Sequence, residues 1–116
     1  MTGRICGTGS YVPARIVEND ELANLVDTND AWIRERTGIA RRHLAENETT
    51  SYMAAEAAKR ALAQSDIPAE DVDLILVATS TPDHCFPNAA CMVQAAIGAE
   101  RAVAYDISAA CSGFFV

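Results

Sequence analysis

Residues 105–116 read "YDISAACSGFFV", and this stretch decides how the rest of the chain is interpreted. Polar and apolar residues alternate from Tyr105 to Ser108, which predicts the end of a β-strand. Two alanines lead to Cys111, and Ser112-Gly113 then precede an apolar run that resembles the start of a helix. Functional side chains of open α/β sheets gather where strands end and helices begin. The sequence therefore places one cysteine at a position suited to chemistry.

The segments before this stretch alternate between the two kinds of secondary structure. A continuous apolar run predicts a strand over 73–80, and strand-forming residues bounded by turn residues predict strands over 3–12 and 101–107. Capping residues and a helical spacing of apolar residues predict helices over 19–26, 30–36, 49–64 and 89–97. This order predicts a mostly parallel α/β sheet with helices on its faces, and the strand over 73–80 is expected to be covered on both faces.

Several helix boundaries follow from single residues. Asn19 is expected to cap the first helix, and Thr28 or Asn29 the second, which Gly38 would end. The helix over 49–64 carries a stripe that is almost entirely alanine, so another element can pack unusually close to it. The segment Gly7-Thr8-Gly9 is expected to be a strand-end turn rather than a phosphate-binding loop.

Composition and charge exclude some classes of protein. The chain has 116 residues, of which 50% are hydrophobic, and a net charge of −7. This charge argues against general nucleic-acid binding, which uses positive surfaces. No stretch approaches the roughly 20 apolar residues of a membrane span, and the N-terminus does not resemble a signal peptide.

The four cysteines lie far apart, with no spacing typical of a metal site, so no metal is expected. Reduced thiols and a cytoplasmic location are the default for such a chain. We interpret Cys85 and Cys91 as packing residues and Cys111 as the chemical one. The backbone N–H groups at a helix N-terminus stabilise a thiolate and can also bind an oxyanion. A buried structural cysteine and a redox sensor remain alternatives, although the sequence offers no nearby resolving thiol.

Five motifs together resemble one family. They are "GTGSYVP" from Gly7, "DTNDAWIRERTGIARRH" from Asp27, "NETTSYMAAEAAKRAL" from Asn47, "LILVATSTPDHCFPNAAC" from Leu74 and "DISAACSGF" from Asp106. Their order and spacing are similar to the N-terminal part of 3-oxoacyl-[acyl-carrier-protein] synthase III. The resemblance implies a thiolase-like fold with α-β-α-β-α layers, of which residues 1–116 would be the incomplete N-terminal portion of the first half.

The resemblance also implies an activity. Cys111 would take an acyl group from acyl-CoA as a thioester and condense it with malonyl-acyl carrier protein, with decarboxylation, to start fatty acid synthesis. Acyl-CoA would be a substrate, and no cofactor is implied. A homodimer is implied, with Phe86 lining the acyl pocket of the partner.

Coenzyme A contacts are implied for Thr28, Trp32 and Arg36. Trp32 and Arg36 stand one helical turn apart, and an aromatic face beside a guanidinium suits a planar base that carries phosphates. Four of the nine basic residues lie between Arg34 and Arg42, which predicts a local basic patch. The alternative is that Trp32 anchors a core and that the arginines form a solvated face.

Two further expectations concern what the chain lacks. The family's catalytic histidine and asparagine would lie beyond Val116, so His43 and His84 are interpreted as surface or interface residues. The chain is expected to be about the first third of a synthase, inactive and poorly folded by itself.

Two alternatives remain for the function: a related acyltransferase of secondary metabolism and a non-catalytic coenzyme-binding module.

Overall fold

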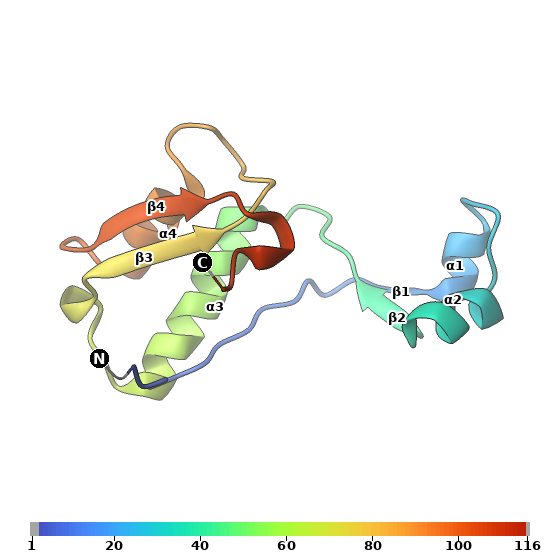
Figure 1. The fold of residues 1–116 in the computed structure, drawn as a ribbon, viewed down its shortest axis with the longest axis horizontal. Coiled ribbons are helices and arrows are strands. Elements are labelled where there is room, and N and C mark those ends of the chain that lie inside the picture. Colours follow the sequence, from blue (N-terminus) through green and yellow to red (C-terminus); the bar gives the residue numbers. More distant parts are fainter. Residues whose placement is uncertain (1–2, 116) are drawn as a thin grey trace. The chain divides into compact units, whose positions relative to one another are not determined.

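A computed structural model describes residues 3–115, so Val116, the last residue of the expected helix start, lies outside the described residues. The helices and strands, in order along the chain, are β1 (Ile16–Glu18), α1 (Asn19–Ala23), α2 (Asp30–Thr37), β2 (Arg41–His43), α3 (Thr50–Ser65), β3 (Leu74–Ala78), α4 (Ala89–Ile97) and β4 (Val103–Ile107), with 3-10 turns at Ala69–Asp71 and Ala110–Ser112 (Figure 1). The chain forms two compact units: Val12–Glu48, and the segments before and after it.

The larger unit is built on the parallel pair β3–β4, as the sequence predicts. The strands pair in register from Leu74 opposite Val103 to Ala78 opposite Ile107. The helix α4 connects them, and α3 and α4 lie together on one face of the pair (Figure 1). The core between helices and sheet consists of small and branched side chains: Ala55, Ile75, Ala90, Val93, Ala99 and Ala102.

The other face of the β3–β4 pair is open. Leu74 and Leu76 are 49% and 44% exposed, and Val103 and Tyr105 are 63% and 46% exposed. The expectation that the strand over 73–80 is covered on both faces is therefore wrong for the described residues. The reason is that both described helices of this unit pack on the same side, which leaves alternate side chains of each strand facing outward.

The N-terminal segment is not the strand predicted over 3–12, because it pairs with no strand among the described residues. It runs instead in an extended conformation against α3. A β-carbon built on Gly9 would lie 2.1 Å from the carbonyl oxygen of Ala57 and 2.5 Å from the backbone nitrogen of Ala61. The two glycines of Gly7-Thr8-Gly9 thus permit a close approach rather than a turn. The prediction that the alanine stripe of α3 admits a close neighbour is confirmed.

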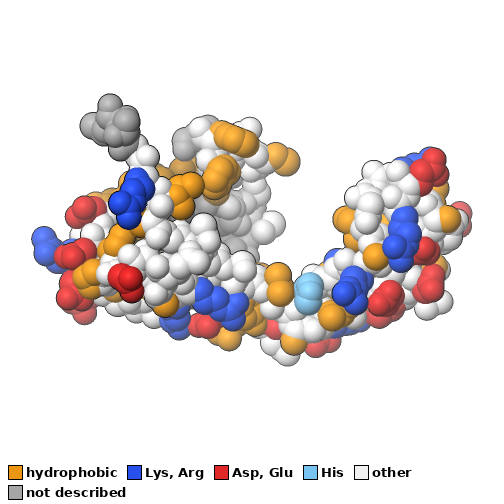
Figure 2. Space-filling model, turned by 90° about the horizontal axis from the view of Figure 1, so that it is seen from below, with side chains coloured by type: hydrophobic (Ala, Val, Ile, Leu, Met, Phe, Trp, Pro, Cys, Tyr) orange, Lys and Arg blue, Asp and Glu red, His pale blue; other side chains and the backbone are white. Residues whose placement is uncertain are grey.

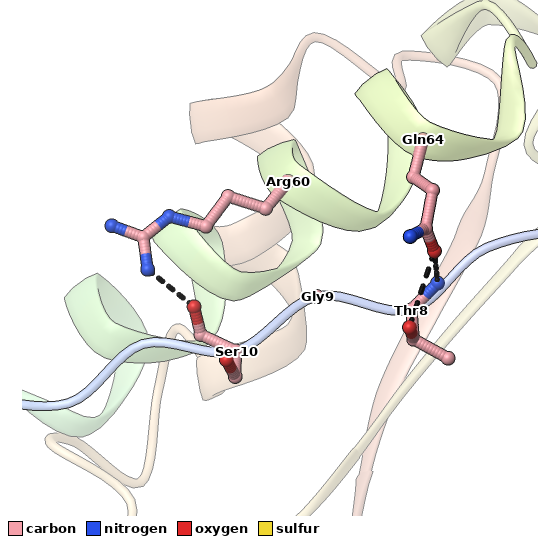
Figure 3. Close-up of a pocket in the computed structure, with 5 residues that line it drawn as sticks. All are labelled: Thr8, Gly9, Ser10, Arg60 and Gln64. Carbon is pink, nitrogen blue, oxygen red and sulfur yellow. Dashed lines mark hydrogen bonds between the residues drawn. The ribbon is translucent and has the colours of Figure 1, made fainter.

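Polar contacts hold this segment in place around a shallow pocket (Figure 3). The Thr8 backbone N–H donates to Gln64 Oε1 at 2.6 Å, and the Thr8 hydroxyl contacts the same oxygen at 3.1 Å. Arg60 donates to the Ser10 carbonyl oxygen. The pocket therefore lies where the segment packs on α3, and these three hydrogen bonds cross it.

The helix α2 begins and ends at predicted caps, Asn29 and Gly38. The side chains of Asn29, Thr49 and Asn88 each accept a backbone N–H at the start of α2, α3 and α4. Gly38 and Gly98 end α2 and α4 with φ of 71° and 75°, which glycine adopts without a Cβ clash.

The smaller unit contains two strands that the sequence does not predict. β1 and β2 pair antiparallel, with Val17 opposite Arg42, and Val17 is only 1% exposed. Asn19 does not cap α1: Glu18 occupies the N-cap position, and Asn19 is the first helical residue with its side chain buried. That prediction is wrong because contacts distant in sequence use the Asn19 side chain.

Candidate functional site

Cys111 lies just beyond the carboxyl end of β4. It is the middle residue of the 3-10 turn Ala110–Ser112, and it is exposed. The turn is placed by the sheet, since a β-carbon built on Gly113 would lie 2.8 Å from the β-carbon of Ala78 at the end of β3. The thiol is thus presented at the edge where the carboxyl ends of two parallel strands meet.

The backbone at Ala110 is in the left-handed region, with φ of 45°. A residue with a β-carbon adopts this conformation rarely and at a cost, so the surroundings must hold it there. It turns the chain sharply between β4 and Cys111. No local sequence signal, such as a glycine or asparagine, indicates this conformation at residue 110.

The expected α-helix after Cys111 is not formed among the described residues, where a single 3-10 turn stands in its place. The backbone N–H groups of Ser112 and Gly113 donate to the carbonyl oxygens of Ala109 and Ala110, at 2.9 and 3.2 Å. These two N–H groups are therefore engaged within the turn. In this conformation neither of these two groups is free to bind an oxyanion. That backbone N–H groups near Cys111 bind an oxyanion stays a prediction.

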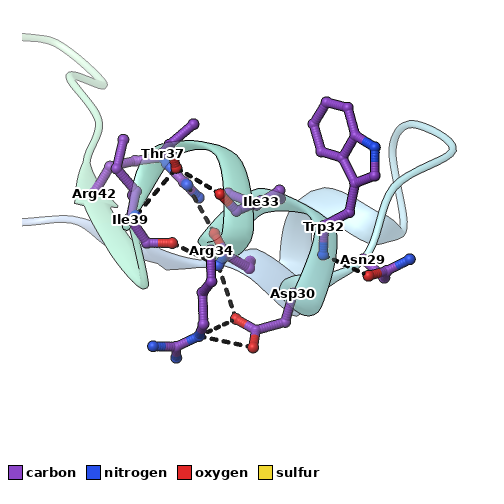
Figure 4. Close-up of polar contacts among 9 residues, drawn as sticks. Asn29, Asp30, Trp32, Ile33, Arg34, Thr37, Ile39 and Arg42 are labelled. Carbon is purple, nitrogen blue, oxygen red and sulfur yellow. Dashed lines mark hydrogen bonds and ion pairs between the residues drawn. The ribbon is translucent and has the colours of Figure 1, made fainter.

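Trp32 and Arg36 form a stacked pair on α2. The Arg36 guanidinium carbon lies 4.4 Å from the centroid of the Trp32 ring, and Trp32 is 50% exposed. The Trp32 backbone N–H donates to Asn29 Oδ1 at 2.8 Å, which fixes the first turn of the helix (Figure 4). The exposure rules out the alternative that Trp32 anchors the core of this unit. An exposed ring beside a guanidinium can hold a planar, anionic ligand.

Thr28 immediately precedes the N-cap of α2 and is half-buried. Its hydroxyl oxygen is buried and has no hydrogen-bond partner among the described residues. Buried hydroxyls in native proteins usually have a partner. Thr28, Trp32 and Arg36 all belong to the smaller unit, whereas Cys111 and Phe86 belong to the larger one.

The arginines between residues 34 and 42 are partly paired with acidic side chains. Arg34 pairs with Asp30 at 2.7 Å, Arg36 contacts Glu35 at 3.6 Å, and Arg42 donates to Asn19 at 2.7 Å. Acidic and basic side chains are accordingly mixed on the surface of this unit (Figure 2). Two of the four arginines face an acidic partner, whereas the partner of Arg42 is a neutral amide, which leaves its charge in place. The acidic partners reduce the positive charge of the predicted patch and do not remove it.

Phe86 lies in the loop between β3 and α4 and is 92% exposed. The loop is tied to α3 through Asp83, whose carboxylate accepts the backbone N–H groups of Thr50 and Ser51 at 2.7 and 3.0 Å, and also the Ser51 hydroxyl. Burial alone would raise the pKa of Asp83, but these hydrogen bonds outweigh it and hold the pKa below its usual value. The sequence gives no signal for this contact, since its partners are remote in the chain.

The remaining candidates make few contacts. His84 is exposed, and the His43 ring lies 2.6 Å from the Pro13 carbonyl oxygen. Cys85 is exposed, so its interpretation as a packing residue is wrong, whereas Cys91 is half-buried with its sulfur 3.8 Å from the Ala104 carbonyl oxygen.

Among residues 3–115, no group of three or more histidine, cysteine, aspartate or glutamate side chains could hold a metal ion. No helix in the same range is long and apolar enough to cross a membrane.

The chain resembles known proteins in its sequence and its fold, although no family model matches it. It is 60% identical over 111 residues to a beta-ketoacyl-[acyl-carrier-protein] synthase III of Granulibacter bethesdensis and 61% identical over 109 residues to that of Acidiphilium cryptum. These matches cover 95% and 93% of this chain but 34% of each relative, so the chain spans about a third of their length.

Solved structures agree. The 3-oxoacyl-[acyl-carrier-protein] synthase III of Aquifex aeolicus superimposes with a TM-score of 0.92 at 51% identity, over 95% of this chain and 36% of that one. The priming beta-ketosynthase of the R1128 polyketide pathway gives a TM-score of 0.92 at 38% identity, over 96% and 34%.

Proposed function

Because this chain matches the N-terminal third of the beta-ketoacyl-acyl-carrier-protein synthase III family and shares its thiolase-like α/β fold, we propose that it is the N-terminal portion of the first thiolase-like half of such a synthase. The observation that carries the proposal is the exposed Cys111 at the carboxyl edge of β3–β4. The complete protein is a condensing acyltransferase of fatty acid synthesis.

The proposed reaction has two stages. The Cys111 sulfur attacks the thioester carbonyl of an acyl-CoA, coenzyme A leaves with its thiol, and the acyl group stays on the cysteine as a thioester. Malonyl-acyl carrier protein then loses carbon dioxide, and the resulting carbanion attacks the acyl group. This releases the Cys111 thiol and a 3-oxoacyl-acyl carrier protein. The groups that stabilise the carbanion are proposed to lie outside residues 1–116.

Coenzyme A is proposed to bind at α2, with its adenine on the Trp32 ring and its phosphates near Arg36. The exposed, stacked pair supports this assignment, and the buried, unpartnered hydroxyl of Thr28 supports a polar contact at the start of the helix. Acyl-CoA is a substrate in this scheme, and no cofactor is proposed.

We further propose a homodimer in which Phe86 lines the acyl pocket of the partner. Its 92% exposure on this chain is what such a contact requires. The proposed location is the cytoplasm, which suits the four free thiols, since reducing conditions keep thiols unpaired. The 116-residue chain by itself is proposed to be inactive.

Mass spectrometry of the complete protein after exposure to acetyl-CoA tests the catalytic assignment. We expect one acetyl group, located on the peptide that contains Cys111, and none after Cys111→Ala. Cys85→Ala is the matched control, because Cys85 is also an exposed thiol of the larger unit. Equal labelling of Cys85 and Cys111 would indicate nonspecific acetylation and would overturn the proposal.

A second candidate function is chain initiation in secondary metabolism. It is favoured by the similarity to the priming beta-ketosynthase of a polyketide pathway. The two candidates share the acylation of Cys111 and differ in the acceptor. Product analysis with carrier proteins from fatty acid and polyketide synthesis distinguishes them.

A further inference from the structure

Asn19 is a fully buried polar side chain, only 1% exposed, in the smaller unit. Its amide makes hydrogen bonds in three directions. Nδ2 donates to Asp30 Oδ1 and to the Ile39 carbonyl oxygen, both at 2.8 Å, and Oδ1 accepts from Arg42 Nη2 at 2.7 Å. The Asn19 amide itself is satisfied in all three directions, whereas Nη1 of Arg42 is buried without a partner among the described residues. A satisfied amide of this kind fixes the groups that it joins.

The partners of Asn19 bracket the helix α2. Asp30 is its first residue, and Ile39 directly follows its C-cap Gly38. Asp30 is also held by Arg34, whose Nε lies 2.8 and 2.7 Å from the two carboxylate oxygens (Figure 4). Because Trp32 lies between these anchored points, the Asn19 amide holds both ends of the segment that carries the stacked pair.

Only a neutral amide suits this position. The hydrogen bond from Asn19 and the contact with Arg34 hold the pKa of Asp30 below its usual value, so this partner is a carboxylate at neutral pH. A carboxylate and a carbonyl oxygen need donors, whereas the Arg42 guanidinium needs an acceptor. Aspartate at residue 19 would supply the acceptor but would repel Asp30.

We propose that Asn19 is a positioning residue for coenzyme binding, acting through Asp30 and Ile39 on the orientation of Trp32 and Arg36. The proposal rests on the proposed function, since it assigns the coenzyme to α2. Asn19 is only 1% exposed, so the proposed role is indirect and needs no contact with the coenzyme. Its loss should weaken recognition of the nucleotide part of the substrate and leave the chemistry at Cys111 intact.

Acyl transfer by the complete protein with two donors tests this. Acetyl-CoA carries the nucleotide, whereas acetyl-pantetheine carries the same thioester without it. For Asn19→Asp we expect the KM for acetyl-CoA to rise roughly tenfold, the scale of a lost hydrogen bond to a charged group. The kcat/KM for acetyl-pantetheine should be unchanged.

The matched control is Asn24→Asp, the same exchange at an exposed position of the smaller unit. It should leave the KM and kcat/KM unchanged with both donors. Equal losses for both donors in Asn19→Asp would indicate a general structural defect and overturn the proposal. Unchanged kinetics with both donors would overturn it as well.

Circular dichroism shows whether Asn19→Asp folds. If it does not, a second variant, Asn19→Ser, tests the same proposal. Asn19→Ser is neutral and smaller, and its hydroxyl cannot span Asp30, Ile39 and Arg42 together, so the same split between donors is expected. Acylation of the wild-type protein distinguishes failure of the proposed function from failure of the positioning role of Asn19. If acetyl-CoA does not acylate Cys111 at all, the proposed function fails. If it does and the Asn19 variants show no split, only the positioning role fails.

Discussion

Gly9 passes so close to Ala57 of α3 that no side chain fits between them: a β-carbon at residue 9 would lie 2.1 Å from the Ala57 carbonyl oxygen. The Ala57 carbonyl oxygen is a backbone atom, so no change of side-chain rotamer can move it out of the way. We therefore expect Gly9→Ala to destabilise the complete protein by about 1–3 kcal/mol, the usual cost of overpacking. Thermal and denaturant unfolding measure this.

Gly3→Ala is the control for this substitution. A β-carbon at Gly3 meets nothing within 4 Å. It should leave the free energy of unfolding nearly unchanged. Equal losses for the two glycines would contradict the close-packing explanation.

Asp83 should contribute stability that depends on pH. Its pKa is lower in the folded protein than in the unfolded chain, so its contribution is complete above the unfolded value of about 3.9 and is lost as the pH falls through the folded value. At pH 7 we expect Asp83→Asn to cost about 1 kcal/mol, the scale of a helix-capping contact. The difference between wild type and variant should shrink as the pH falls below 4.

Denaturant unfolding at several pH values measures this difference. Asp71→Asn, at an exposed position, is the control and should show no such trend. A difference that stays constant down to strongly acidic pH would indicate that the carboxylate of Asp83 is not the stabilising group.

Gly113 should control how Cys111 is presented. The β-carbon in Gly113→Ala would lie 2.8 Å from the Ala78 β-carbon and would push the turn off the end of β3. We expect acylation of Cys111 to slow roughly tenfold or more, since small displacements of reacting groups have large effects on rate. Rapid-quench mass spectrometry with acetyl-CoA measures the rate.

The double variant Gly113→Ala/Ala78→Gly tests the cause directly. It removes the atom that the new methyl group meets, so the rate should recover. Slow acylation in the double variant would show that glycine at residue 113 is needed for another reason.

Trp32 and Arg36 should contribute differently to coenzyme binding. Stacking of a base on an aromatic ring contributes about 1–3 kcal/mol, so Trp32→Ala should raise the KM for acetyl-CoA roughly tenfold or more. Arg36→Ala should also raise it, and should in addition reduce its dependence on salt, since charge attraction is screened. Steady-state kinetics at several salt concentrations separate these effects. A KM for acetyl-CoA unchanged by either substitution would place the coenzyme elsewhere.

Phe86 should affect substrate choice rather than stability. Because it is 92% exposed on this chain, Phe86→Ala removes almost no buried surface within it. We expect the ratio of the kcat/KM values for short and long acyl-CoA donors to change, because the donors differ only in the acyl chain that Phe86 would contact. Competition between acyl-CoA donors measures this preference. An unchanged preference would contradict the proposed acyl-pocket role.

Local signals account for what could be predicted from the sequence. Asn29 and Gly38 define the ends of α2 because capping depends on residues within one helical turn. The parallel β3–β4 pair and the place of Cys111 follow from the alternation of apolar runs and helices. The alanine stripe of α3 likewise predicts a close neighbour, although not which segment it would be.

Contacts between remote residues account for what was missed. The N-terminal segment is extended like a strand, but a strand also needs a partner, and the local sequence does not supply one. Its glycines, which are uncommon in strands, instead allow it to approach α3. β1 and β2 contain only three residues each, too few to show alternation. Asn19 and Asp83 resemble ordinary capping or loop residues until the fold brings their partners to them.

The open face of the β3–β4 pair has a consequence for biosynthesis. Leu74, Leu76, Val103 and Tyr105 form a hydrophobic surface that the described helices do not cover. While the ribosome extends the polypeptide, this surface is available to chaperones and to other nascent chains. Sequencing of the mRNA segments protected by chaperone-bound ribosomes should therefore show chaperone recruitment soon after these strands leave the exit tunnel.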